Sequence, residues 1–398
     1  MKNILILGGD GFCGWPTALH FSNLGHNVSI IDNLSRRKID VELGVESLTP
    51  ISSIETRLET WERISGKQIP FYYLDLSIEY DRLLTIIKKN KFDVIIHFAE
   101  QRAAPYSMKN SHTKRYTVNN NINATHNILC AIVESGLDIH LVHLGSMGVY
   151  GYGTANMEIP EGYLDVCFGE ASSTVTKEIL YPPSPGSIYH MTKTQDAQMF
   201  AYYSQNDNLR ITDLHQGIVW GTITAETKLH ENLINRFDYD GDYGTVLNRF
   251  LMQSAIGHPL TVHGTGLQTR AFIHITDTLK CFEIAINNPP RKGDKVKIFN
   301  QMTETFRVRD LANIISEQTE SEVLYMPNPR KEDSENDLYV SNKCFLDLGL
   351  NPTLISTEVF PEITEIASKY SSRCNKKYIL AKSYWSDIER QNANNETY

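Results

Sequence analysis

The chain contains 398 residues, of which 41% are hydrophobic and 21% are charged. This length and composition are typical of a globular protein with one large domain and a second lobe grown onto it. Acidic residues outnumber basic residues by 47 to 38 and the net charge is -9. Such a charge argues against a general binder of nucleic acid or of anionic membranes.

Hydrophobic runs and cysteines narrow the class of protein further. No apolar run approaches the roughly 18 residues that cross a bilayer, and the run at residues 4–7 is too short for the core of a signal peptide. The six cysteines form no C-x-x-C pair, so neither a zinc ribbon nor a dithiol redox centre is expected and reduced thiols are the default. We expect a cytoplasmic protein with no nucleic-acid partner and no membrane insertion.

The first part of the chain alternates short buried strands with longer helices. Residues 4–7 and 28–31 are predicted strands on either side of a Gly-rich turn and an amphipathic helix that ends at Gly25. Further strands are expected at 71–74, 94–98, 140–144 and 211–214, and the longest helices at 113–134 and 191–204. This alternation predicts an α/β fold, a doubly wound parallel sheet covered by helices on both faces.

From about Trp220 the pattern changes to charged, turn-rich segments. Between them lie strand candidates at 260–263, 272–275 and 297–300, which indicate a smaller α/β lobe. We expect residues 1–220 to form the first domain, with an insertion near 152–185, and residues 221–398 to form mainly the second lobe, with room for one element to return to the main sheet. The acidic stretch 226–242 is interpreted as a mobile segment that covers a ligand.

Residues 8–14 read Gly-Gly-Asp-Gly-Phe-Cys-Gly, follow the first predicted strand and open the first predicted helix. The spacing G-x-x-G-x-x-G is a variant of the Rossmann fingerprint, in which glycines make the turn, admit a pyrophosphate and allow close packing of helix on sheet. The phosphates would lie at the helix N-terminus, where free N–H groups favour an anion. Similar glycines also occur at tight turns that bind nothing.

Asp32 supports the ligand-binding interpretation because it ends the second predicted strand. A carboxylate there accepts hydrogen bonds from the adenosine ribose and repels a 2′-phosphate, which predicts NAD rather than NADP as the cofactor. Arg36 and Arg37 are either ribose contacts or solvated loop charges, and Asp75 is either an adenine contact or a turn residue. The predicted cofactor-binding residues are Gly8, Asp10, Gly11, Phe12, Cys13, Gly14, Asp32, Asn33, Leu34, Arg36, Arg37, Asp75, Leu76, Phe98, Ala99, Glu100, Asn120, Tyr189 and Lys193.

Tyr189 and Lys193 form a Tyr-x-x-x-Lys pair. On a helix, a spacing of four places the phenol and the ammonium on one face. There the cation lowers the pKa of the tyrosine, and a tyrosinate takes a proton from a substrate hydroxyl while hydride leaves the same carbon. Ser146 follows the predicted strand 140–144 and offers a hydroxyl to the same substrate oxygen. We therefore predict catalysis by Ser146, Tyr189 and Lys193.

With these motifs the chain resembles the extended short-chain dehydrogenase/reductase superfamily, whose sugar-nucleotide members share the glycine motif, the strand-end aspartate and the Ser/Thr, Tyr, Lys trio. The likeness extends from Lys2 to about Arg330. Longer and less common strings are similar to the UDP-sulfoquinovose synthase family in particular, at residues 8–16, 97–108, 238–240, 247–250, 257–262, 268–270 and 327–330. Because these strings are spread over most of the chain, the resemblance is specific.

The resemblance implies an enzyme that makes UDP-sulfoquinovose from UDP-glucose and sulfite with a tightly held NAD. Tyr189, aided by Ser146 and Lys193, would deprotonate the glucose 4-hydroxyl as hydride passes to NAD, and the resulting 4-ketone would acidify the C5 proton. Loss of the 6-hydroxyl gives an enone, sulfite adds at C6, and the hydride returns to C4. The second lobe is then the UDP-sugar-binding lobe.

Three features depart from related families. Sugar 4,6-dehydratases usually carry an Asp-Glu pair just after the active-site Thr, where this chain has Met147 and Gly148. The acid and base of the elimination step are therefore unassigned. Ser146 stands where plant-type synthases have Thr, and both residues supply a hydroxyl. The segment between Ser146 and Tyr189 is longer than in a simple epimerase, and we interpret the insertion as a lid that keeps water from a reactive enone.

The implied substrates are anions, so their contacts are expected among donors and cations. Arg102 and His190 are the candidates for sulfite, with an NAD or phosphate contact as the alternative for Arg102 and a half-buried helix position as the alternative for His190. Three arginines suit the UDP phosphates, although Arg330 is also read as a solvated loop charge. The predicted substrate-binding residues are Arg102, Met147, Tyr189, His190, Gln216, Val219, Asn248, Arg249, Thr261, Val262, His263, Gln268, Thr269, Arg270 and Arg330.

Other functions stay open at this point. UDP-glucose 4-epimerases and nucleotide-sugar 4,6-dehydratases share the first hydride step, and a catalytically silent NAD-sensing module would use the same fold to bind a protein partner. His143, His258 and His274 lack metal-ligand spacing and are interpreted as core or loop histidines, so no metal is predicted. A homodimer is expected because superfamily members pair the helices that here begin near Tyr106 and at Tyr189.

Overall fold

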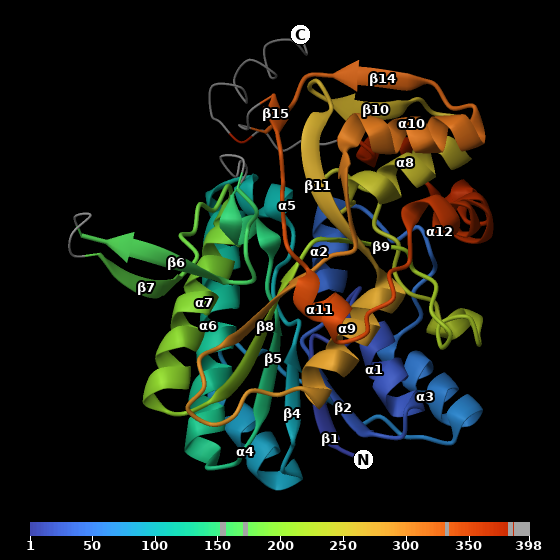
Figure 1. Ribbon diagram of the computed structural model, residues 1–398. Coiled ribbons are helices and arrows are strands. Elements are labelled where there is room, and N and C mark those ends of the chain that lie inside the picture. The colour runs from blue at the N-terminus through green and yellow to red at the C-terminus, as the bar shows by residue number, and fades with distance from the viewer. Residues whose placement is uncertain (152–156, 170–173, 331–333, 381–384, 386–398) are drawn as a thin grey trace.

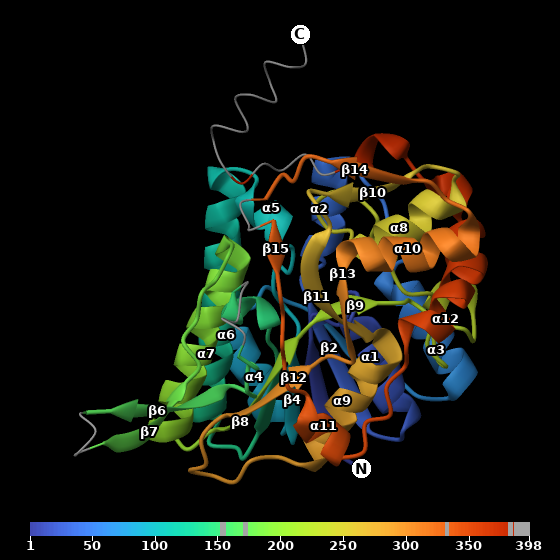
Figure 2. The same cartoon turned by 45° about the horizontal axis from the view of Figure 1, so that its top comes forward.

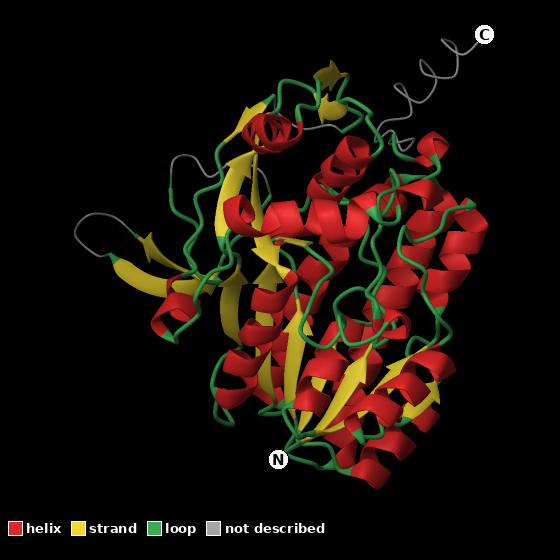
Figure 3. Cartoon of the chain, turned by 90° about the vertical axis from the view of Figure 1, so that its right-hand side faces the viewer, coloured by secondary structure: helices red, strands yellow, loops and turns green. Residues whose placement is uncertain are grey.

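The computed structural model describes residues 1–151, 157–169, 174–330, 334–380 and 385. Its centre is a seven-stranded parallel sheet with the order β12-β8-β5-β4-β1-β2-β3 (Figures 1 and 3). The chain runs outward from β1 to β3 on one side and then from β4 outward on the other. The predicted doubly wound sheet is therefore confirmed. The strands are β1 (Asn3–Leu7), β2 (Asn27–Asp32), β3 (Phe71–Tyr73), β4 (Val94–His97), β5 (His140–Leu144), β8 (Arg210–Gln216) and β12 (Lys297–Gln301).

Helices cover both faces of this sheet and enclose one apolar core on each side (Figure 1). Residues 4–7 of β1 are all apolar, because Ile4 and Ile6 enter one core and Leu5 and Leu7 enter the other. Successive side chains of a strand point to opposite faces. One core is covered by α1 (Gly14–Asn23), α3 (Ile54–Ser65) and α9 (Ile275–Asn287), and the other by α4 (Tyr80–Asn90), α6 (Ser111–Ser135) and α7 (Ile188–Asn206).

The second lobe has its own core around Phe250, Phe272 and Leu311. Its longest strand, β11 (Leu267–His274), contains the expected strand 272–275 except for Ile275, which begins α9. The strand β12 returns to the main sheet and pairs with β8. The other elements are β9 (Ile218–Trp220), β13 (Glu304–Arg307) and β15 (Glu335–Asn336) beside β11, the pair β10 (Leu260–His263) and β14 (Val323–Met326), and the helices α8 (Val246–Ala255) and α10 (Val308–Thr319).

Shorter helices complete the described chain, namely α2 (Ser35–Leu43), α5 (Ala104–Met108), α11 (Lys343–Asp347) and α12 (Ile355–Pro361). The predicted helices 113–134 and 191–204 correspond to the longer helices α6 and α7, and Gly25, expected to end the first helix, follows α1 with a φ of +86°. That left-handed conformation strains any residue with a Cβ, which is why a glycine ends the helix. Among the described residues, no helix is both long enough and apolar enough to cross a membrane.

The insertion near 152–185 forms a hairpin rather than a lid. The strands β6 (Tyr163–Phe168) and β7 (Val175–Leu180) pair antiparallel and project sideways next to α7 (Figures 1 and 2). The hydroxyl of Tyr163 donates to the carbonyl of Val296 at 2.8 Å, which fixes the hairpin beside the edge strand β12. None of the described residues of the insertion lines the main pocket, so the lid interpretation is wrong for them. Residues 152–156 and 170–173 lie outside the described residues.

The acidic stretch 226–242 is packed into the molecule, so its interpretation as a mobile cover is also wrong. Leu233 belongs to a core of the main sheet and Phe237 to the core of the second lobe, and both are fully buried. Arg236 pairs with Asp40 at 2.6 Å and with Asp238 at 3.1 Å. Asp238 of this stretch therefore balances the buried Arg236, while Leu233 and Phe237 fix the stretch against both lobes.

Candidate active site

A pocket of about 350 Å³ lies between the main sheet and the second lobe. Gly8, Phe98, Gly145 and Gln216 line one side of it, and each lies at the carboxyl end of a strand of the main sheet. Residues of β10 and β11 line the opposite side. A smaller hollow of about 70 Å³ adjoins the pocket, because Gly8 and other residues line both. Open α/β sheets bind ligands in this place, where the strand order reverses.

The glycine-rich loop after β1 forms a cradle at the N-terminal end of α1. Gly8 has a φ of +82°, and a Cβ on Gly14 would lie 2.1 Å from the carbonyl oxygen of Gly8. Neither position therefore tolerates a side chain. Gly11 lines both hollows and its Cβ would approach only the Gly8 carbonyl oxygen, at 3.2 Å. Its missing side chain leaves room for a phosphate group at the helix N-terminus.

Asp32 ends β2 and lines the smaller hollow. Its two carboxylate oxygens accept the backbone N–H groups of Asp10 at 2.9 Å and Leu34 at 2.7 Å. Burial, and then the neighbouring carboxylate of Asp10, raise the pKa of Asp32 to about 6. A carboxylate has more acceptor sites than these two amides use, so the hollow fits the adenosine half of a dinucleotide.

The two arginines after Asp32 take different positions. Arg37 forms a bidentate pair with Asp10, at 2.6 and 2.8 Å, and the fully buried Arg57 donates to the same carboxylate at 2.7 Å. This carboxylate holds the guanidinium of Arg37, which lines neither hollow, so a contact of Arg37 with the cofactor stays a prediction. Arg36 lines both hollows, and its guanidinium lies 3.6 Å from the centroid of the Tyr243 ring.

Ser146, Tyr189 and Lys193 meet at the main pocket. Ser146 follows β5, while the other two lie in the first two turns of α7. The ammonium of Lys193 is 5.9 Å from the centroid of the Tyr189 ring. Burial raises the pKa of Tyr189, whereas Lys193, Arg102 and a hydrogen bond to Ser146 act to lower it. This arrangement allows Tyr189 to exchange a proton with a ligand hydroxyl.

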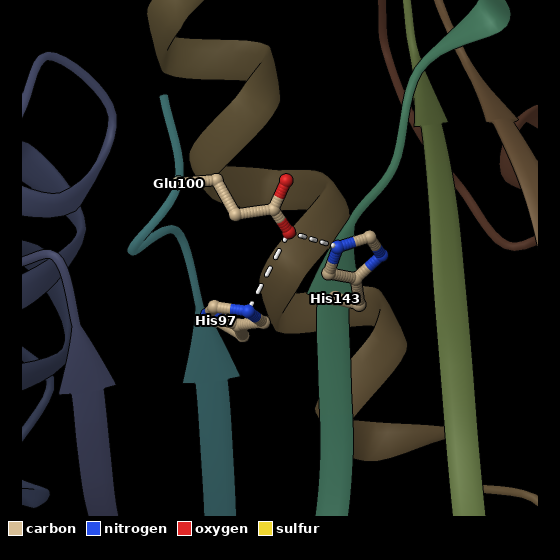
Figure 4. A group of neighbouring side chains, drawn as sticks. All are labelled: His97, Glu100 and His143. Atoms are coloured by element: carbon tan, nitrogen blue, oxygen red, sulfur yellow. Dashed lines mark hydrogen bonds and ion pairs between the residues drawn. The ribbon is translucent and has the colours of Figure 1, made fainter. Parts of the chain in front are cut away.

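Behind this trio, Lys193 reaches a group of buried polar side chains, of which Figure 4 shows His97, Glu100 and His143. Its Nζ lies 2.7 Å from Glu100 Oε2 and 2.7 Å from the carbonyl oxygen of Leu144. His97, Glu100 and His143 bring ligand-type atoms within 4.8 Å of one another. The ammonium of Lys193 already lies against the same carboxylate and supplies the positive charge that a metal ion would bring. His143 is a core residue as expected, but it is also paired with charged groups.

The charge on His143 predicts a pH-dependent stability. Burial and Lys193 act to lower the pKa of His143, but Asp213 and Glu100 outweigh them and raise it from 6.5 to about 9. A pKa that is higher in the folded state contributes stability that is fully present below pH 6.5 and is lost as the pH rises through about 9. The other titratable groups that face the ring are His97 and Asp196, and Asp213 pairs in turn with His215.

We therefore expect the free energy of unfolding to fall between pH 6.5 and about 9, and the variant His143→Asn to show a flatter decline over the same range. Urea unfolding at a series of pH values measures both slopes. The variant His258→Asn is the matched control, because His258 lies in the turn before β10 and its ring hydrogen-bonds to the Pro259 carbonyl oxygen at 2.8 Å, away from the group around His143. Parallel curves for wild type and His143→Asn would contradict the prediction.

At the far end of the pocket, three arginines gather in the second lobe. Arg249, Arg270 and Arg330 line this end together with His263. Burial, and then Arg330, lower the pKa of Arg249 to about 10, and burial with the same two arginines lowers the pKa of His263 to about 3. Cations that destabilise one another around a pocket favour an anionic ligand.

Two residues proposed for sulfite line the pocket in different charge states. His190 is 8% exposed, and burial, followed by Arg330 and Arg270, lowers its pKa to about 3. It is therefore neutral near pH 7 and offers a hydrogen bond rather than a charge. Arg102 donates to Asp238 at 2.5 Å, and its side chain is 35% exposed. Of these two residues, the arginine therefore supplies the positive charge and the histidine supplies a neutral hydrogen-bonding group.

Most predicted site residues line one of the two hollows: Gly8, Asp10, Gly11, Phe12, Cys13, Gly14, Asp32, Asn33, Arg36, Leu76, Phe98, Ala99, Glu100, Arg102, Asn120, Ser146, Met147, Tyr189, His190, Lys193, Gln216, Val219, Arg249, Thr261, His263, Gln268, Arg270 and Arg330. Six do not: Leu34, Arg37, Asp75, Asn248, Val262 and Thr269. Val262 lies in the core of the second lobe because it alternates with Thr261 and His263 along β10.

The other predicted site residues that line neither hollow form contacts with their neighbours instead. Asp75 accepts hydrogen bonds from Asn33 and Ser77, which agrees with the alternative interpretation as a turn residue. The amide of Asn248 donates to the carbonyl of Asp238 at 3.4 Å. The backbone N–H of Thr269 donates to Asn336 at 2.7 Å. Leu34 has a φ of +53° and packs against a core of the main sheet.

Sequence reasoning missed several residues that line the pocket. Arg236 and Tyr243 lie just outside the string 238–240 that carried part of the family resemblance, so extending that string would have found them. Tyr116 lies within α6 and Asn328 follows β14. No sequence signal distinguishes Tyr116 from the other tyrosines of the chain.

Comparison with known proteins agrees with this site. Residues 4–300 match the NAD dependent epimerase/dehydratase family. The chloroplastic UDP-sulfoquinovose synthase of Spinacia oleracea is 41% identical over 392 residues, which cover 97% of this chain and 80% of the relative. The UDP-sulfoquinovose synthase of Sulfolobus acidocaldarius is 36% identical over 394 residues, 96% of this chain and 97% of the relative.

Solved structures show the same fold. The UDP-glucose 4-epimerase of Thermotoga maritima superposes with a TM-score of 0.67 over 93% of this chain and 98% of that chain, at 18% identity. The UDP-glucose 4-epimerase of Stenotrophomonas maltophila gives a TM-score of 0.69 at 19% identity, over 94% of this chain and 98% of that chain. The resemblance predicted from the sequence strings is thus confirmed. The chain belongs to the NAD dependent epimerase/dehydratase family and, within it, to the UDP-sulfoquinovose synthases.

Proposed function

We propose that this protein converts UDP-glucose and sulfite into UDP-sulfoquinovose, with NAD as a cofactor that is reduced and reoxidised in one cycle. The observation that carries the proposal is the trio Ser146, Tyr189 and Lys193 on a pocket whose two ends fit a dinucleotide and a second anion. Similarity over almost the full chain to two UDP-sulfoquinovose synthases supports it.

The cofactor site is assigned to residues 1–220. The glycine cradle would hold the pyrophosphate of NAD, and Asp32 its adenosine ribose. When bound, NAD supplies the hydride acceptor at the start of the cycle and the hydride donor at its end. Lys193 holds its ammonium on the same side of the pocket as Tyr189. Arg36 adds a guanidinium beside the cradle, stacked on the Tyr243 ring.

Tyr189 takes the proton of the sugar 4-hydroxyl at its phenolate oxygen and returns it when C4 is reduced. Ser146 hydrogen-bonds to Tyr189 and would bind the same sugar oxygen. Lys193 stabilises the phenolate, because an adjacent cation favours the charged form of a phenol. The 4-ketone acidifies C5–H, so the C6–O bond breaks with loss of water, and the sulfur of sulfite forms a bond to C6.

The UDP-sugar site is assigned mainly to residues 221–398. Arg249, Arg270 and Arg330 would bind the diphosphate, since guanidinium groups suit bidentate contacts to phosphate. Sulfite is assigned to Arg102 and His190. Because Asp238 uses only part of the Arg102 guanidinium, the half-exposed remainder offers N–H donors and charge, and neutral His190 offers a further hydrogen bond.

Mass spectrometry of the products tests this function. Purified protein is incubated with UDP-glucose, with and without sulfite, and UDP-sulfoquinovose is expected only when sulfite is present. Formation of UDP-galactose or of a 4-keto-6-deoxy sugar without sulfite would show an epimerase or a dehydratase instead. If neither product forms and the variant Tyr189→Phe keeps the biological function, the chain is a silent NAD-binding module.

The carboxylate of Asp32 predicts the choice between NAD and NADP. We expect Asp32→Asn to weaken NAD binding about tenfold, ~1.4 kcal/mol. The variant should also have a smaller preference for NAD over NADP, because the repulsion of a 2′-phosphate is removed. Calorimetric titration with both nucleotides measures the two affinities. Asp75→Asn is the matched control, since Asp75 follows β3 and lines neither hollow. Unchanged selectivity in Asp32→Asn would contradict the assignment.

We also propose a homodimer formed through α6 and α7, which pack side by side (Figures 1 and 2). Val133 on α6 is 38% exposed and Tyr202 on α7 is 59% exposed, so apolar area is available on this face. Sedimentation equilibrium is expected to give twice the chain mass of 45.3 kDa. The variant Tyr202→Glu is expected to shift the protein to monomer, and a wild-type monomer would contradict the proposal.

A further inference from the structure

The carboxylate of Glu100 faces His97 and His143 of the main sheet (Figure 4), and it also contacts the ammonium of Lys193. Glu100 follows β4, and its side chain is 3% exposed. One carboxylate oxygen lies 2.7 Å from Lys193 Nζ, and the other lies 2.9 Å from His143 Nε2. A buried carboxylate is stable only when cations and donors surround it, and here two cationic side chains do so.

The pairing continues into the sheet. The ring of His143 lies with its other nitrogen, Nδ1, 2.8 Å from Asp213, and Asp213 lies 3.0 Å from His215. Both nitrogens of the His143 ring face carboxylate oxygens, although Nε2 also lies 3.0 Å from Lys193 Nζ. Asp213 and Glu100 outweigh burial and Lys193 and raise the pKa of His143 to about 9, which favours the cationic ring near pH 7. Two cations, Lys193 and His143, then balance the two carboxylates Glu100 and Asp213. Burial, and then Glu100, raise the pKa of the adjacent Asp196.

We propose that Glu100 is a positioning residue for the reaction: its carboxylate, backed by His143 and Asp213, fixes the ammonium of Lys193 and so places the positive charge beside the Tyr189 phenol. This inference rests on the proposed function, because it assigns a purpose to a fixed Lys193. It adds a residue that acts through the lysine. A lysine side chain is long and flexible with three rotatable donors, so it keeps one position only if its environment fixes it.

The geometry accounts for the position of the ammonium. Lys193 Nζ lies 2.7 Å from Glu100 Oε2, 2.7 Å from the Leu144 carbonyl oxygen and 3.0 Å from His143 Nε2. These contacts hold the Lys193 side chain at the wall of the pocket that it lines with Tyr189. The charge on Glu100 alone would disfavour a tyrosinate, and the cation on His143 offsets it. If Glu100 loses its charge, two cations remain with Lys193 Nζ and His143 Nε2 only 3.0 Å apart, so His143 would release its proton at lower pH.

The test compares Glu100→Gln, which keeps the shape but removes the charge, with wild type. We expect kcat to fall about tenfold or more with KM for UDP-glucose within about twofold. The alkaline limb of the kcat profile should shift by about one pH unit toward lower pH. A second readout needs no turnover. The tyrosinate absorbance of Tyr189, isolated by subtracting the titration of Tyr189→Phe in cofactor-free protein, should shift in apparent pKa.

Two further variants distinguish a positioning role of Glu100 from a purely structural role. Glu362→Gln removes another buried carboxylate, one that accepts the backbone N–H groups of Thr222 and Ile223 in the second lobe. It is expected to lower Tm without moving the pH profile. Glu100→Asp keeps the charge on a shorter side chain. Its alkaline limb should lie between those of Glu100→Gln and wild type. If Glu100→Gln does not fold, Glu100→Asp is expected to show the same shifts at reduced size.

The outcomes are distinct. If Glu100→Gln lowers Tm but leaves the pH profile and the Tyr189 titration as in wild type, Glu100 is structural and the inference is overturned. If wild type itself forms no product from UDP-glucose and sulfite, the proposed function fails. The Tyr189 titration still decides whether Glu100 acts through Lys193 in that case, because it is measured without substrate.

Discussion

Replacing Tyr189 by phenylalanine is expected to lower kcat by about 10² to 10⁴-fold, the range typical for loss of a general acid–base group. The ring is retained, so its packing against His190, with centroids 5.2 Å apart, should persist. Only the hydroxyl that exchanges a proton with the sugar is lost. We expect the affinities for UDP-glucose and NAD to stay within about twofold, since an interaction made only in the transition state affects kcat alone.

Steady-state kinetics with chromatographic detection of UDP-sulfoquinovose measures kcat and KM, and calorimetry measures binding to the free protein. Tyr203→Phe is the matched control. Tyr203 lies further along α7, and its hydroxyl contacts Cys130 and His126 away from the pocket. Turnover in Tyr189→Phe close to that of wild type would remove Tyr189 from the chemistry and leave the proton transfer to another group.

The second large effect is expected at Arg249. Its side chain is buried, and the lowered pKa, about 10, shows that its charge is disfavoured while the pocket holds no anion. Arg249→Met should therefore raise KM for UDP-glucose about 100-fold, ~2.8 kcal/mol, by removing charged hydrogen bonds to the diphosphate. The same variant should leave the stability of the free protein unchanged or higher, because a buried cation is replaced by an apolar side chain of similar length.

Thermal unfolding with and without UDP tests both halves of this prediction. UDP should raise Tm in wild type, because a ligand that binds only the folded state stabilises it, and should not do so in Arg249→Met. Arg210→Met is the control, since Arg210 pairs with the exposed Asp138 at 2.9 Å far from the pocket. A large loss of stability in Arg249→Met without UDP, or an unchanged KM, would contradict the assignment of Arg249 to the diphosphate.

Much of the fold follows from local patterns. The strands of the main sheet are short apolar runs because residues such as Ile4 and Leu5 enter opposite cores, and this pattern is legible without a structure. The insertion near 152–185 is different. Its length can be counted from the sequence. The direction in which the hairpin projects depends on the contact of Tyr163 with Val296, which lie far apart in the chain.

The candidate site divides in the same way. The glycine cradle, Asp32 and the trio Ser146, Tyr189 and Lys193 could be predicted without coordinates, because each motif lies on or next to a strand or helix that the local sequence predicts. The pairing of charges could not. Arg37 pairs with Asp10, and Glu100 and His143 meet behind Lys193. Buried charges select their partners by distance in space, and the folding of strands from separate parts of the chain sets that distance.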